Sequence, residues 1–138
     1  MDTTFNSVLL VDDSEIDELV NRRLIELTRF ASNVVITNSG EEALHYLREE
    51  CRPSSAPDLI FLDMYLPMMS GYEFIEEFKT LPSFITTKSK IIILSVFQKK
   101  EKLQRAFENS FVAGQLEKPL TQEALKKLAE QKSIRVSS

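Results

Sequence analysis

The feature that most constrains the fold is an alternation of short apolar runs with segments whose apolar residues recur at helical spacing. Each run is apolar continuously rather than at every second residue, which is the pattern of a strand buried on both faces. The five runs, of which the last is the weakest, span residues 7–11, 33–37, 59–62, 91–94 and 111–116. Strands that alternate with helices favour a parallel sheet. The sequence therefore predicts an α/β fold with a doubly wound, five-stranded parallel sheet and helices on both faces.

Five segments are expected to be helical, at residues 16–27, 39–50, 70–80, 98–109 and 121–131. Ser14 is the expected N-cap of the first helix, and Ser39 and Glu42 stand in capping-box register at the start of the second. Residues 81–89 are expected to form a loop. The apolar residues that recur at helical spacing in the first helix are Ile16, Leu19, Val20, Leu24 and Leu27.

The composition limits the classes of function. The chain has 138 residues, and its net charge of −4 argues against nucleic acid as the main partner. Cys51 is the single cysteine, which excludes an intramolecular disulfide and fits a reducing cytoplasm. The N-terminus lacks the features of a signal peptide, and no apolar run is long enough to span a bilayer. We therefore expect one cytoplasmic domain without membrane insertion.

Polar residues stand where the predicted strands end. Asp12 and Asp13 follow the first strand and Asp63 follows the third. Ser95 follows the fourth strand and Lys118 the fifth. Because ligands bind beyond the carboxyl ends of the strands in such sheets, we expect these five side chains to converge on one edge.

The chemistry of this set favours phosphoryl transfer. Clustered carboxylates repel one another unless a cation lies among them, and oxygen ligands of this kind suit Mg²⁺. A carboxylate beside Mg²⁺ can attack a phosphoryl group and become an aspartyl phosphate. Lys118 could supply a fixed positive charge, and Ser95 a hydroxyl donor to a phosphoryl oxygen. This chemistry would explain a carboxylate at the end of a buried strand, because Asp63 could be the one that is phosphorylated.

Four motifs, "LLVDDSE", "IFLDMYLPMMSGYEF", "IIILSVF" and "EKPL", resemble the receiver domain of two-component response regulators. The resemblance covers about residues 5–130 and implies a flavodoxin-like sheet with strand order 2-1-3-4-5. It implies that Asp63 is the phosphoacceptor. It also implies that Asp12, Asp13, Asp63 and the backbone carbonyl of Tyr65 bind Mg²⁺.

The same resemblance assigns the remaining residues and the partners. Ser95 matches the switch hydroxyl and Lys118 the lysine that contacts the phosphate, with a cis peptide bond before Pro119. The phosphodonor would be a sensor histidine kinase or a histidine phosphotransfer protein, and the downstream protein target is unknown. Residues 5–131 would form the receiver and residues 132–138 a short tail with no room for an output domain. Such a protein is not an enzyme, since it catalyses only its own phosphorylation and dephosphorylation.

The sequence departs from the pattern at Gln115. Many receivers have Tyr or Phe three residues before the lysine, and that ring turns inward on activation. Gln115 has no ring, and burying its amide without a partner would cost about 1–3 kcal/mol. We therefore predict that Gln115 stays near the surface in both states, and that the change is confined mainly to residues 95–97 and the start of the fourth helix.

Three other classes of function share some of these features. A pseudo-receiver would bind partners without phosphorylation, an option that Gln115 keeps open. A small hydrolase with an aspartyl-phosphate intermediate would need a second Asp two residues after Asp63, where the chain has Tyr65. A nucleotide-binding module would need a glycine-rich loop, and Gly40, Gly71 and Gly114 are too widely spaced to form one. The sequence favours a phosphorylation-controlled switch that signals through protein–protein contacts or as an intermediate in a phosphorelay.

Overall fold

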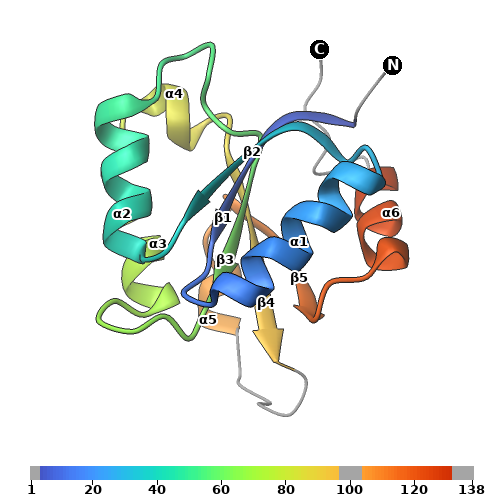
Figure 1. Cartoon of the computed structure of the whole chain (residues 1–138). Helices are drawn as coiled ribbons and strands as arrows, with labels where there is room; N and C mark the ends of the chain where they lie inside the picture. The colour runs from blue at the N-terminus through green and yellow to red at the C-terminus, as the bar shows by residue number, and fades with distance from the viewer. Residues whose placement is uncertain (1–3, 97–103, 132–138) are drawn as a thin grey trace.

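The computed structural model describes residues 4–96 and 104–131, and these contain a five-stranded, fully parallel sheet (Figure 1). The strands are β1 (Phe5–Val11), β2 (Ala31–Thr37), β3 (Leu59–Asp63), β4 (Lys90–Val96) and β5 (Val112–Lys118). Their order in the sheet is β2-β1-β3-β4-β5, and each neighbouring pair is parallel. The predicted fold class and strand order are therefore confirmed.

Helices cover both faces of the sheet, as predicted. They are α1 (Glu15–Leu27), α2 (Gly40–His45), the π-helix η1 (Tyr46–Glu50), α3 (Gly71–Phe78), α4 (Ser83–Thr86), α5 (Gln104–Phe107) and α6 (Gln122–Glu130). In Figure 1, α1 and α6 lie on one side of the strands and α2, α3 and α4 on the other. In the described part of the chain, no helix has both the length and the apolar character needed to cross a bilayer.

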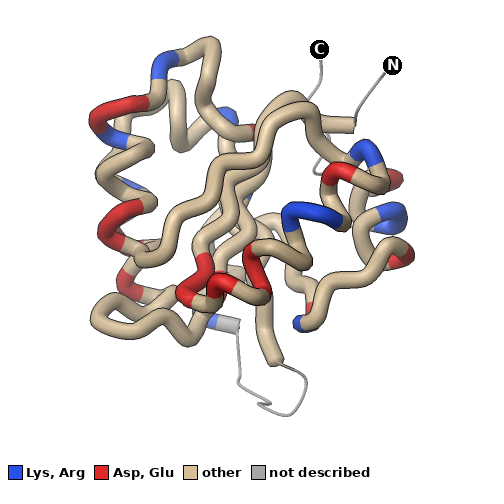
Figure 2. Tube along the Cα trace, viewed as in Figure 1, with Lys and Arg blue, Asp and Glu red and all other residues tan. Residues whose placement is uncertain are grey.

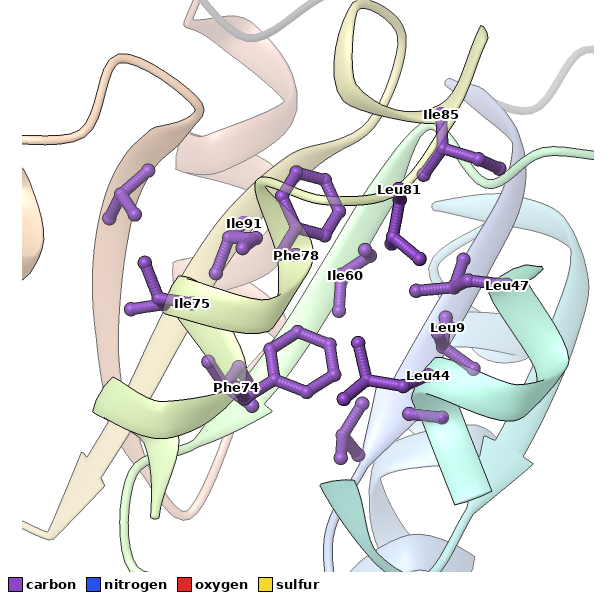
Figure 3. Close-up of a cluster of buried hydrophobic side chains, with 14 of the residues drawn as sticks. Leu9, Leu44, Leu47, Ile60, Phe74, Ile75, Phe78, Leu81, Ile85 and Ile91 are labelled. Carbon is purple, nitrogen blue, oxygen red and sulfur yellow. The ribbon is translucent and has the colours of Figure 1, made fainter. Parts of the chain in front are cut away.

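Alternate residues of the central strands supply the two halves of the core. Leu9 and Ile60 point to the face that α2 and α3 cover, where they pack in one cluster with Phe74 and Phe78 of α3 (Figure 3). The residues next to Leu9 and Ile60 in each strand point to the opposite face, where Phe61 packs on Phe30 with 5.9 Å between ring centroids. Continuous apolar strands are thus buried on both sides, which holds their carboxyl ends at one rigid edge.

Helix α1 does not pack on the sheet through the face that carries most of its apolar residues. Its apolar residues Ile16, Leu19, Val20 and Leu27 are 74%, 69%, 47% and 61% exposed, and only Leu24 of that set is partly buried. The residues that α1 buries are Glu18, Asn21 and Ile25. Polar contacts explain this rotation, because the Asn38 side chain donates to Glu18 Oε1 at 2.6 Å and Asp17 lies 3.3 Å from Lys118.

Several predicted boundaries are corrected. The second predicted helix is α2 followed by the π-helix η1, at whose end the Cys51 N–H donates to the Tyr46 carbonyl. A short helix, α4, interrupts the predicted loop at 81–89. Strand β5 continues to Lys118 because that residue pairs with Val96, so backbone pairing outlasts the apolar run. Residues 98–103 of the fourth predicted helix and the tail at 132–138 lie outside the described residues, and α5 accounts for Gln104–Phe107.

The expected helix caps are present in part. Ser14 accepts a hydrogen bond from the Asp17 N–H, and Ser39 accepts one from the Glu42 N–H. A capping box would also have the Glu42 side chain accept from the backbone N–H of Ser39. Here Glu42 accepts from the backbone N–H of Asn38 instead, at 3.4 Å. These caps start both helices at the edge of the sheet where the candidate site lies.

Candidate functional site

The three carboxylates that the sequence placed at strand ends lie together. Asp12 and Asp13 follow β1, Asp63 ends β3, and one oxygen of each lies within 4.8 Å of the others. Asp12 and Asp63 are buried, whereas Asp13 is exposed. Figure 2 shows acidic residues where β1 leads into α1. Adjacent parallel strands that end at one edge bring these residues together, as predicted.

Lys118 reaches into this cluster from the end of β5. Its Nζ lies 3.0 Å from Asp63 Oδ2, 3.1 Å from Asp12 Oδ2 and 3.3 Å from Asp17 Oδ2. Burial by itself would lower the pKa of Lys118, but hydrogen bonds and charges from Asp63 and Asp12 outweigh it and raise the pKa. Lys118 is therefore a fixed cation at the cluster. The peptide bond to Pro119 is cis, the geometry that the resemblance implied.

The two oxygens of Asp63 are held by different donors. The backbone N–H of Tyr65 donates to Oδ1 at 2.9 Å, and Lys118 donates to Oδ2 at 3.0 Å. The loop after β3 is folded tightly behind this contact, because a Cβ on Gly71 would lie 2.8 Å from the Cα of Met64. Side-chain and backbone donors thus fix the orientation of the Asp63 carboxylate.

Asp12 is a buried carboxylate whose negative charge is only partly compensated. Burial raises its pKa, and the Ser14 backbone N–H and Lys118 only partly offset that effect. Its Oδ1 accepts from Ser14 N–H at 3.0 Å, but its buried Oδ2 has no aligned hydrogen-bond partner among the described residues. Three carboxylates share the single ammonium group of Lys118, and this excess of negative charge fits a hard divalent cation.

Ser95 and Gln115 are in direct contact, which the sequence did not predict. Ser95 is 5% exposed, and the Gln115 side-chain Nε2 donates a hydrogen bond to its Oγ at 2.9 Å. Gln115 is exposed in this structure, in line with the expectation that it lies near the surface. Its amide is nevertheless tied to the predicted switch hydroxyl, so a change at Ser95 cannot leave Gln115 unaffected.

Two residues near the site were missed in the sequence. Asp17 forms an ion pair with Lys118, and Glu18 is buried with a pKa raised to about 7 by burial first and then by the charges of Asp12, Glu15 and Glu42. Acidic residues in the first turn of a helix are common because they favour the helix dipole. The sequence therefore offers no reason to assign Asp17 and Glu18 to the site. Their position beside the cluster depends on how α1 is rotated against the sheet.

Comparison with known proteins identifies the family. A family profile described as the response regulator receiver domain matches residues 8–130. The chain belongs to the response regulator receiver family. The chain is 30% identical over 125 residues to the "Probable methanogenesis regulatory protein FilR2" of Methanothrix harundinacea, covering 90% of this chain and 79% of that protein. It is also 30% identical to the "Autoinducer 1 sensor kinase/phosphatase LuxN" of Vibrio harveyi, but spans only 13% of that protein's length.

Solved structures agree with this assignment. A two-component response regulator from Cytophaga hutchinsonii matches with a TM-score of 0.80 and 30% identity, covering 90% of this chain and 93% of that one. A response regulator receiver protein from Dyadobacter fermentans matches with a TM-score of 0.74 and 27% identity, covering 88% and 93% of the two chains. The receiver is thus a domain of two-component signalling, as the sequence motifs indicated.

Proposed function

We propose that this receiver is a phosphorylation-controlled switch that accepts a phosphoryl group on Asp63. The observation that carries the proposal is the 3.0 Å contact between Lys118 Nζ and Asp63 Oδ2, inside a cluster of three carboxylates. A buried carboxylate that is held by two donors and flanked by a fixed cation is oriented for attack on an electrophile.

The transfer itself is a displacement at phosphorus. A carboxylate oxygen of Asp63 attacks the phosphorus of a phosphohistidine whose other ring nitrogen is protonated. The P–N bond breaks, its electron pair stays on the imidazole nitrogen, and the histidine leaves as neutral imidazole. The product is an acyl phosphate on Asp63 and an unphosphorylated histidine. Lys118, in contact with Asp63, would balance charge on the phosphoryl oxygens, and the Ser95 hydroxyl would donate to one of them.

Mg²⁺ is the proposed cofactor. Asp12, Asp13 and Asp63, with the Tyr65 backbone carbonyl, would hold it. When bound, Mg²⁺ neutralises the charge that accumulates on the transferring phosphoryl group. Beyond its own phosphorylation and dephosphorylation, the proposed receiver performs no catalysis.

The proposed partners follow from the family. A sensor histidine kinase or a histidine phosphotransfer protein supplies the phosphoryl group, and the receiver formed by residues 5–131 passes the signal on through a protein–protein contact or phosphorelay. The cytoplasm is the proposed compartment, which suits the free, buried thiol of Cys51.

Labelling by acetyl phosphate tests the phosphoacceptor. In the presence of Mg²⁺ the wild-type protein should gain one phosphoryl group, and Asp63→Asn should not, because an amide cannot form the acyl phosphate. Glu41→Gln, at an exposed carboxylate on α2, is the matched control and should label normally. Undiminished labelling of a folded Asp63→Asn protein would show that the acceptor is elsewhere. A wild-type protein that binds its partners but never labels would be a pseudo-receiver.

A further inference from the structure

A hydrogen bond joins Gln115 of β5 to Ser95 of β4. Its donor is Gln115 Nε2 and its acceptor is Ser95 Oγ, at 2.9 Å. The two residues lie on adjacent parallel strands, where Ser95 is opposite Glu117 and Gln115 is opposite Ile93. They are therefore diagonal neighbours on one face of the sheet, a separation that a long side chain can bridge.

A register shift makes this contact possible. The pairing of β4 with β5 shifts between Ile91 and Ile92, so that Val112 is opposite Ile91 but Gly114 is opposite Ile92. Because side chains alternate between faces, a slip of one residue moves every following side chain to the other face. Leu116 is thereby placed in the core cluster on the α1 side, and Gln115 is placed on the face that carries Ser95.

The polarity of the bond determines what Ser95 can do. A serine hydroxyl has one hydrogen to donate and two lone pairs that accept. When Gln115 fills one acceptor position, the single hydrogen of Ser95 is left for another acceptor. Leu94, the residue before Ser95, pairs with Asp63, so the backbone of Ser95 lies one residue beyond Asp63 at the same carboxyl edge of the sheet.

We propose that Gln115 is a positioning residue that orients the Ser95 hydroxyl as a donor toward a phosphoryl group on Asp63. This rests on the proposed function of Asp63. Gln115 stays near the surface while doing so, and its donor is satisfied by a buried oxygen instead of being buried unpaired. A polar contact between β5 and β4 thus stands where many receivers have an aromatic ring.

Three variants at Gln115 separate this role from packing. Gln115→Glu keeps the shape but turns the donor into an acceptor that takes the Ser95 hydrogen. Gln115→Met keeps the length and removes the donor without replacing it. Gln115→Lys restores a donor, although it carries a charge.

Beryllofluoride binding in the presence of Mg²⁺ is the measurement. Gln115→Glu should weaken binding about tenfold, since a hydrogen bond to a charged group is lost. Gln115→Met should weaken it less, because the hydroxyl can still rotate toward the ligand, and Gln115→Lys should bind no more weakly than Gln115→Met. In a Ser95→Ala background the change to Glu should alter binding by less than about twofold, an exposed-charge effect only.

Three results would overturn the proposal. They are wild-type binding by Gln115→Glu, an equal loss for Gln115→Met and Gln115→Glu, and a loss that persists unchanged in the Ser95→Ala background.

A second measurement keeps the inference separate from the proposed function. The hydrogen bond is present in the unphosphorylated protein, so urea unfolding of the wild type, Ser95→Ala, Gln115→Met and the double variant should show non-additive stabilities. Additive stabilities would refute the contact itself. A wild-type protein that shows the coupling but does not bind beryllofluoride would refute the proposed function of Asp63 instead.

Discussion

Replacing Glu18 by Gln should make the protein more stable at neutral pH but not at acidic pH. Glu18 is 6% exposed, and its pKa is raised from 4.5 to about 7, chiefly by burial and then by the charges of Asp12, Glu15 and Glu42. The folded state therefore holds a proton on Glu18 between these two values, whereas the unfolded state has released it. Under those conditions the free energy of unfolding falls as the pH rises.

The size of the effect follows from the two pKa values. The interval between 4.5 and about 7 corresponds to about 3 kcal/mol, at about 1.4 kcal/mol for each pH unit. The contribution of Glu18 to wild-type stability should fall by this amount between pH 4.5 and pH 7 and then level off. Gln has no proton to lose, and its side-chain oxygen can still accept the hydrogen bond from Asn38. The stability difference between Glu18→Gln and the wild type should therefore grow by about 3 kcal/mol over this interval.

Urea unfolding in metal-free buffer across this pH range would measure the difference. Subtracting the wild-type curve removes the contribution of the other carboxylates. Glu41→Gln, at an exposed position, should differ from the wild type by less than about 0.5 kcal/mol at every pH. A difference between Glu18→Gln and the wild type that does not change with pH would refute the reasoning, because it would mean that Glu18 titrates alike in both states.

Two further predictions concern the cluster itself. Mg²⁺ at about a hundred times its dissociation constant should stabilise the fold by about 2.7 kcal/mol in thermal melts; a melt that remains equally sensitive to Mg²⁺ in Asp13→Ala would place the metal elsewhere. Asp17→Asn should speed labelling by acetyl phosphate about two- to fivefold, because it frees Lys118 and removes a negative charge; the effect is modest because the Asp17 side chain is 45% exposed. Glu15→Gln removes an equal charge from the same helical turn, and an equal acceleration there would show that the contact with Lys118 is irrelevant.

Much of the fold could be read from the sequence because the apolar runs specify buried strands directly. The convergence of Asp12, Asp13, Asp63 and Lys118 followed from the same reasoning, since strand ends of a parallel sheet meet at one edge. Strand limits were less accessible, because the backbone of Lys118 pairs with Val96 whatever side chain it carries.

Two features could not be predicted for a physical reason. The rotation of α1 depends on polar contacts with distant residues, which compete with its apolar pattern and prevail. The contact between Gln115 and Ser95 depends on a one-residue slip between β4 and β5. The polar partners of α1 are distant in the sequence, and the slip is an irregularity within one pair of strands, so both appear only once the chain is folded.

The exposed apolar residues of α1 also bear on how the protein moves. This helix buries only Glu18, Asn21 and Ile25, and two of these are polar. Elements that bury little apolar surface open locally at a low free energy. Strand β3 is buried along its whole length, and we expect it to open only when the entire domain unfolds. Asp17 belongs to α1 and forms an ion pair with Lys118, so each opening of the helix withdraws one carboxylate from Lys118. The electrostatic environment of Asp63 is therefore expected to fluctuate with the breathing of one helix, and amide exchange along α1 would report its frequency.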